Sequence, residues 1–146
     1  MAFDLSRFID AQQVVYASAL SELRAACKRG HWMWFVFPQL RGLGHSEMSR
    51  FYGLENIAEA TVYLQHPILG HRLMECTNAV LQLGNTSLSQ IFGSPDNMKF
   101  ISSMTLFSLI EDTLDVFGKA LAKFNDGNPD LVTLQAIDFL QKGLEC

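Results

Sequence analysis

The chain has 146 residues, of which 49% are hydrophobic and 18% charged, and its formal net charge is −4. This length and composition are typical of one globular domain, so we expect a single domain over residues 1–146. The acidic balance, without a basic stripe, argues against nucleic-acid binding. No apolar run approaches the roughly 20 residues that a membrane-spanning helix needs.

The cysteine pattern and the first residues bear on the compartment. Cys27, Cys76 and Cys146 are widely spaced and form no C-x-x-C pair. An odd set of this kind is typical of reduced thiols in a cytoplasm rather than of a disulfide framework. Residues 1–7 lack the basic region followed by an apolar region that a signal peptide has. The sequence therefore predicts a cytoplasmic protein.

The N-terminal part shows helical periodicity and then a dense aromatic block. We expect a short helix capped by Asp4 or Ser6 and a longer helix that ends near Gly30. Residues 31–39 (HWMWFVFPQ) hold both tryptophans of the chain, and their apolar run fits either a buried strand or a helical turn. Because a lone strand leaves backbone groups unpaired and no other run alternates like a partner strand, we predict a helical turn.

The rest of the chain continues as helices separated by turn residues. The expected elements are a turn after Ser46, helices over residues 56–64 and 67–83, a turn over residues 88–92, and helices over residues 94–110, 114–124 and from residue 130 onward. The helix Ser94–Ile110 is apolar around much of its girth, which is typical of a central helix. We predict an all-α fold of about seven or eight helices.

Several runs in the sequence resemble a known family. They are residues 31–39 with the GLG of residues 42–44, residues 63–70 (YLQHPILG) and residues 99–107 (KFISSMTLF). Over nearly the whole chain the sequence is similar to an uncharacterised bacterial domain-of-unknown-function family, sometimes mislabelled calpastatin, with a mycobacterial member of all-helical fold. The resemblance implies an all-α domain and no activity. The calpastatin label would imply a largely disordered protease inhibitor, which this apolar composition does not fit.

His31 and Gln39 lie at the two ends of the aromatic block, beside Trp32 and Trp34. A histidine can exchange protons near neutral pH, and with Gln39 it could face a small planar or anionic ligand stacked on an indole ring. The alternative is structural, with His31 satisfied at the end of a core segment and both tryptophans in the core.

Lys99 is the second candidate. Asp96, Lys99 and Ser103 fall on one helical stripe, Ser102 brackets the same face, and Thr105 is a further polar group in this apolar run. A desolvated lysine can activate a serine or hold an anion. The sequence has no Gly-x-Ser-x-Gly elbow, and the alternative is a surface lysine paired with Asp96.

Metal and cofactor sites are not predicted. The histidines at positions 31, 45, 66 and 71 include no pair at i and i+4, and no His-Glu-x-x-His motif occurs. Gly42 and Gly44 alone do not indicate a nucleotide-binding loop, because no strand precedes them. We therefore expect neither a metal nor a cofactor.

Two functions remain open at this point. The first is a small-molecule pocket, with or without catalysis, between the aromatic block and the helix Ser94–Ile110. Its candidate lining residues are His31, Trp32, Trp34, Gln39, Lys99, Ser102, Ser103 and Thr105. The alternative is a helical protein-interaction module without catalysis, for which the six methionines would supply an adaptable surface. The first hypothesis requires that the aromatic block and the later helix pack against each other.

Overall fold

The structure is a computed structural model and describes residues 3–110 and 115–144. Within these residues the chain forms nine helices and one isolated bridge between Leu40 and Leu54. In chain order the helices are α1 (Ser6–Arg24), α2 (Met33–Val36), α3 (Glu47–Tyr52), α4 (Ile57–Gln65), α5 (Leu69–Leu81), α6 (Leu88–Phe92), α7 (Asp96–Ser108), α8 (Val116–Phe124) and α9 (Leu131–Leu144). The all-α class is confirmed. Leu114, expected to begin a helix, and Cys146 lie outside the described residues.

The expected number of seven or eight helices is wrong. The two helices expected before Gly30 form the single helix α1, and the turns expected after Ser46 and over residues 88–92 are regular enough to form α3 and α6. Both turns are stabilised by their own caps, because the side chains of Ser46 and Ser87 accept hydrogen bonds from the backbone N–H three residues later.

The end of α1 also differs from the expectation. Gly30 was predicted to end the helix, but α1 ends at Arg24, and Ala26 takes the left-handed conformation with φ of 57°. Cys27 N donates to Glu22 O at 3.0 Å and Ala26 N donates to Leu23 O at 3.0 Å. These two bonds complete a Schellman termination, which satisfies the last carbonyl groups of the helix. The residues up to Gly30 are thereby free to form a loop beside the aromatic block.

The helix expected over Ser94–Ile110 is shorter in the structure. It begins at Asp96 and ends at Ser108, and Pro95 precedes it without any side-chain cap from Ser94. Its central position is confirmed, since every residue from Phe100 to Phe107 is buried. A helix buried on all sides needs neighbours all round, and α7 packs against α4, α6, α8 and α9.

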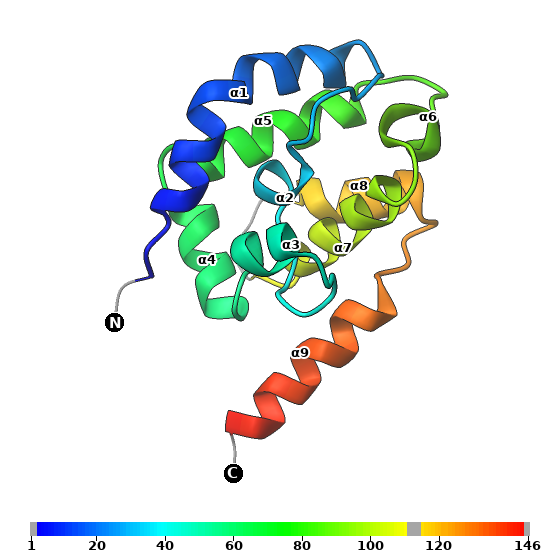
Figure 1. The fold of residues 1–146 in the computed structure, drawn as a ribbon. Coiled ribbons are helices and arrows are strands. Elements are labelled where there is room, and N and C mark those ends of the chain that lie inside the picture. The colour runs from blue at the N-terminus through cyan, green and yellow to red at the C-terminus, as the bar shows by residue number, and fades with distance from the viewer. Residues whose placement is uncertain (1–2, 111–114, 145–146) are drawn as a thin grey trace.

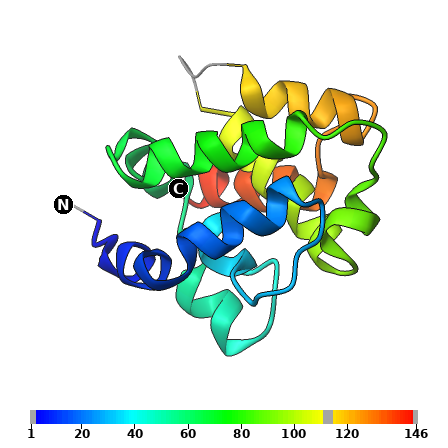
Figure 2. The same cartoon turned by 90° about the horizontal axis from the view of Figure 1, so that it is seen from above.

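The other helices surround this central element. In Figures 1 and 2, α1 runs beside α5, and α5 lies between α1 and α8, in agreement with the contacts between these helices. The short helix α2 contacts α1, α3 and α5. Helix α9 packs against α7, runs along the lower edge of the molecule in Figure 1, and contributes Ile137 to the core. Among the described helices, none combines the length and apolar character that crossing a membrane requires.

Candidate functional site

The aromatic block packs directly against α7, as the first hypothesis requires. The Phe37 and Phe100 rings meet edge to face with centroids 5.1 Å apart, and Phe92 of α6 stacks on Phe100 at the same separation. The block forms only one helical turn, α2, within an otherwise irregular segment. The predicted contact between these two parts of the chain is therefore confirmed.

Two lysines link the block to the start of α7. The Lys28 ammonium lies 5.1 Å from the Trp32 ring centroid, and the Lys99 ammonium lies 5.3 Å from the Trp34 ring centroid. Both lysines face Asp96, with Lys28 Nζ 2.9 Å from Oδ2 and Lys99 Nζ 3.7 Å from Oδ1. The predicted pairing of Lys99 with Asp96 exists, but 3.7 Å exceeds a hydrogen bond. Lys28 is the closer partner of this carboxylate.

The two tryptophans have different environments. Trp32 is 2% exposed, and its Nε1 donates to Glu22 Oε1 at 3.0 Å. Trp34 is half-buried, yet its Nε1 atom is buried and has no hydrogen-bond partner among the described residues. An unpaired buried N–H destabilises the folded state by about 1–3 kcal/mol. The indole N–H of Trp34 carries this cost, and that of Trp32 does not.

Glu22 completes the environment of Trp32. Besides the indole, its Oε1 accepts hydrogen bonds from Arg29 N at 2.7 Å and Gly30 N at 2.9 Å. Burial raises the pKa of this carboxyl group, but the bonds from Gly30, Arg29 and Trp32 outweigh burial, so that the pKa is lowered overall. A carboxylate from α1 thus holds the loop that leads into the aromatic block.

A small cavity lies beside Trp34. Its volume is about 10 Å³, close to what one water molecule occupies. The lining residues come from the aromatic block, from α7, and from α3 with the glycine that follows it (residues 47–53, the α3 segment). They are Met33, Trp34, Phe37, Gln39, Ser49, Tyr52, Gly53 and Lys99. Three of the eight predicted site residues, Trp34, Gln39 and Lys99, therefore meet at one cavity.

The other five predicted residues do not line this cavity. Trp32 is buried, and His31 is exposed. Ser102 and Thr105 face the start of α9, where Ser102 Oγ donates to Asp130 Oδ2 at 3.1 Å and Thr105 Oγ1 accepts from Asp130 N at 2.8 Å. Asp130 also caps α9, whose start at this point was predicted, by accepting a bond from the N–H of the third helical residue. These two hydroxyl groups hold α9 in place.

Ser103 is the fifth residue outside the lining. It lies one helical turn after Lys99, is 0% exposed, and its Oγ has no partner within residues 3–110 and 115–144. A nucleophilic serine needs access for a substrate and an adjacent base. The structure gives Ser103 no such access in this conformation.

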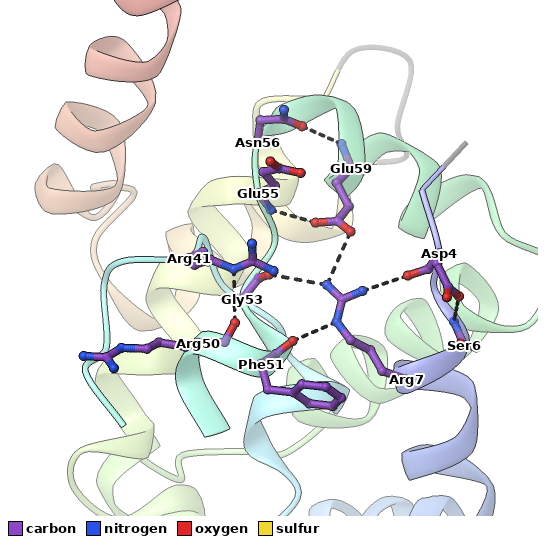
Figure 3. A network of polar contacts seen from close by, with 10 residues as sticks. All are labelled: Asp4, Ser6, Arg7, Arg41, Arg50, Phe51, Gly53, Glu55, Asn56 and Glu59. Carbon is purple, nitrogen blue, oxygen red and sulfur yellow. Dashed lines mark hydrogen bonds and ion pairs between the residues drawn. The ribbon is translucent and has the colours of Figure 1, made fainter. Parts of the chain in front are cut away.

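Sequence reasoning missed the network that holds the α3 segment, which forms one wall of the cavity. Figure 3 shows the Arg7 guanidinium at its centre, 3.3 Å from Glu59 Oε2. Arg7 also donates to the backbone carbonyls of Phe51 at 2.8 Å, Asp4 at 2.8 Å and Gly53 at 3.4 Å. The Glu59 side chain is only 5% exposed, so this ion pair is largely shielded from water. It ties α1 and α4 to the end of α3.

Part of this network had a signal in the sequence. The cap residue Asn56 is followed three positions later by Glu59, and Asn56 Oδ1 accepts from Glu59 N at 2.9 Å. Glu59 Oε1 in turn accepts from Glu55 N at 2.7 Å. The partnership with Arg7 had no signal, because the two residues are far apart in the chain.

A second missed network lies between α1, α2, α4 and α5, with Gln12 and Tyr63 buried and Arg72 partly buried. Gln12 Nε2 donates to Phe35 O at 2.6 Å, and Tyr63 OH donates to the same carbonyl at 3.1 Å. Arg72 Nη1 donates to Gln12 Oε1 at 3.4 Å. Burial raises the pKa of Tyr63 well above its ordinary value. This network satisfies the carbonyl in the middle of α2 and is structural.

Neighbouring groups extend this network toward the surface. Tyr16 donates a short hydrogen bond to Glu75, and the Arg72 guanidinium lies 4.7 Å from the Tyr16 ring. Burial raises the pKa of the Cys76 thiol to about 12, and Cys76 Sγ lies 3.8 Å from Tyr16 OH. The thiol is therefore protonated at neutral pH and is not a nucleophile. In the described part of the chain, no three His, Cys, Asp or Glu side chains gather as metal ligands.

The structure is thus an all-helical fold with a small cavity between an aromatic segment and its central helix. The chain belongs to the family described as Protein of unknown function (DUF1810), which matches residues 2–137. The expected membership in such a family is confirmed, and the description of the family states no activity.

One solved structure is similar over nearly the whole chain. It is the crystal structure of the conserved hypothetical protein Rv1873 from Mycobacterium tuberculosis, with 51% sequence identity and a TM-score of 0.91. The match covers 93% of this chain and 97% of that chain. No curated protein matches the chain.

Proposed function

We propose that this chain is a small-molecule-binding protein whose binding site is the cavity beside Trp34, Gln39 and Lys99. The observation that carries the proposal is the buried Trp34 Nε1–H, which has no acceptor within the described residues. A buried donor without a partner costs about 1–3 kcal/mol, and an acceptor atom of a ligand would remove this cost. Trp32, two positions earlier, has its acceptor within the protein.

The cavity has the surroundings that a ligand site needs. One wall is aromatic, with Trp34, Phe37 and Tyr52, and the polar groups of Gln39 and Lys99 lie at its edge. A few polar groups on a mostly apolar wall are typical of small-molecule sites. Trp34 is half-buried, so part of its ring is accessible for stacking.

A ligand larger than a water molecule requires the cavity to widen. The α3 segment supplies Ser49, Tyr52 and Gly53 to the lining and is one of the shortest elements of the fold. We expect this segment to move outward on binding with loss of the Arg7 hydrogen bonds to Phe51 O and Gly53 O, while α7 keeps its position because its residues from Phe100 to Phe107 are buried. The proposal covers binding alone, since Ser103 does not line the cavity and catalysis has no assigned residue.

The test uses the side-chain signals of the two tryptophans in a ¹H–¹⁵N NMR spectrum. We expect a fraction of small metabolites, added as mixtures to the purified protein, to shift the Trp34 indole signal and to leave the Trp32 signal in place. Trp34→Phe and Trp32→Phe spectra assign the two signals. If no mixture shifts the Trp34 signal selectively, and native mass spectrometry finds no retained metabolite, the proposal is wrong.

The alternative function, a protein-interaction module without catalysis, is favoured by exposed apolar side chains on α9. Phe139 is 76% exposed, and Leu131 and Val132 are 66% and 59% exposed. The methionines support this alternative only in part, since Met98 is 64% exposed and Met33 is buried. Under this alternative, Phe139→Ser would abolish complex formation with a protein partner and leave the Trp34 indole signal unchanged.

A further inference from the structure

The cavity proposed as the binding site is rich in hydrogen-bond donors, which bears on the chemistry of the ligand. Lys99 Nζ carries three N–H donors and, among the described residues, makes no hydrogen bond. Its closest partners are Asp96 Oδ1 at 3.7 Å and the Trp34 ring at 5.3 Å. The Lys99 side chain is only 22% exposed, so water covers this charge incompletely.

The carboxylate nearest to Lys99 is already engaged. Asp96 Oδ2 lies 2.9 Å from Lys28 Nζ, and the Lys28 side chain is 7% exposed. Lys28 also donates to Gly30 O at 2.5 Å. Lys28 holds Asp96 at hydrogen-bond distance, whereas Lys99 makes only the longer ion pair with the same carboxylate. One carboxylate thus faces two ammonium groups, and this leaves one positive charge in excess.

Two more donors belong to the same cavity. Trp34 Nε1 has no acceptor within residues 3–110 and 115–144, and the Gln39 amide, which also lines the cavity, carries two N–H donors beside its carbonyl oxygen. The Ser49 hydroxyl, which also lines the cavity, already accepts a bond from Ser46 Oγ at 3.0 Å. Among the described lining residues there is no Asp or Glu.

From this arrangement we infer that the group bound beside Trp34 is an oxyanion, that is, a carboxylate or a phosphate of the ligand. The inference rests on the proposed function. An oxyanion accepts several hydrogen bonds at once, and bonds between charged partners are roughly twice as strong as neutral ones. A cationic group would meet the Lys99 charge without a lining carboxylate to compensate, and a neutral group would leave Lys28 and Lys99 sharing the single charge of Asp96. Lys99, Trp34 and Gln39 are the residues that would donate to the anion.

The experiment compares small solutes that differ in shape and charge, and it follows the indole NMR signals of Trp32 and Trp34. Sodium acetate, acetamide, inorganic phosphate and sodium chloride are titrated separately into the protein at matched ionic strength. We expect acetate or phosphate to shift the Trp34 signal in a saturable way, while chloride and acetamide, which has the shape of acetate without its charge, do not. The choice between acetate and phosphate distinguishes the two kinds of oxyanion.

Variants assign the effect to Lys99. Lys99→Met keeps the aliphatic stem over Trp34 and should weaken the anion response at least about tenfold. Lys119→Met removes an exposed charge on α8 and should bind as the wild type does. Urea unfolding of Lys99→Met checks that the variant is folded, which is expected because Asp96 keeps Lys28.

The outcomes separate the two proposals. If metabolites shift the Trp34 signal but acetate and phosphate do not, or if acetamide acts as acetate does, the site binds a ligand and the oxyanion inference is wrong. Anion binding that persists unchanged in Lys99→Met also overturns it. If nothing shifts the Trp34 signal, both the inference and the proposed function are wrong.

Discussion

Replacing each tryptophan by phenylalanine tests whether Trp34 serves binding rather than stability. Trp32→Phe and Trp34→Phe remove the same atoms from positions two residues apart. Trp32 loses a hydrogen bond to the Glu22 carboxylate, and Trp34 loses a buried N–H that has no partner among the described residues. The two substitutions should therefore have different effects on the free energy of unfolding.

The structure allows an estimate for each variant. A hydrogen bond to a charged group is worth about 1.5–3 kcal/mol, and the lower end applies at Trp32 because Arg29 and Gly30 still donate to Glu22. The cavity left by the missing ring atoms adds about 1 kcal/mol, so Trp32→Phe should lose about 2.5–3 kcal/mol. In Trp34→Phe the packing loss is smaller, because Trp34 is half-buried, and the removal of an unpaired donor offsets this loss. The free energy of unfolding of Trp34→Phe should therefore stay within about 1 kcal/mol of the wild-type value.

Equilibrium unfolding in urea, followed by far-ultraviolet circular dichroism, measures both values without relying on tryptophan fluorescence. The dependence on urea concentration should have the same slope in both variants, because the same surface is exposed on unfolding. Equal losses in the two variants, or a larger loss for Trp34→Phe, would refute the reasoning. Such a result would place the Trp34 indole in the stabilising core.

Further predictions concern the fold around the site. A Cβ on Gly70 would lie 1.9 Å from a carbonyl oxygen of α4, so Gly70→Ala should lose more than about 2 kcal/mol, while Gly84→Ala, with open space, should stay within about 0.5 kcal/mol in urea unfolding. Arg7→Met leaves the buried Glu59 carboxylate without its cation and should cost about 3 kcal/mol, part of which Glu59→Gln restores in the double variant. The Cys76 thiol ionises near pH 9 in the unfolded chain but has a pKa of about 12 when folded. Stability should therefore fall as the pH rises above 9, by up to about 1.4 kcal/mol per pH unit from this group, and Cys76→Ala should flatten the profile measured by thermal unfolding.

Helix caps were predictable from the sequence because the capping side chain and the backbone N–H that it binds lie within one helical turn of each other. Ser46, Asn56 and Ser87 stand where the sequence places the start of a turn or helix, and each accepts a bond from the backbone N–H three residues later. The buried character of α7 followed from its apolar residues on all sides. The end of α1 before Ala26 was not predictable, because nothing in the sequence indicates that an alanine will take the left-handed conformation. Glycine takes that conformation readily, so the sequence favoured an end at Gly30.

For the candidate site, the sequence predicted only that the aromatic block and the helix after Pro95 pack against each other. Their contact is confirmed, but the pattern of residues did not distinguish the side chains that reach the cavity from those that hold α9. Ser102 and Lys99 are three residues apart on one helix, yet Ser102 faces Asp130 and Lys99 faces Trp34. That choice depends on what packs against each side of α7.

The amino-acid sequence alone determined that the chain is all-helical, where most helices begin, and which helix is central, because periodicity and capping act over a few residues. Only the tertiary structure decided which tryptophan has a partner. Glu22, ten residues before Trp32, reaches its indole, and no described residue reaches the indole of Trp34. The difference arises because α1 ends early and the loop before the block folds back onto its last turn, which places the Glu22 carboxylate beside one of the two rings.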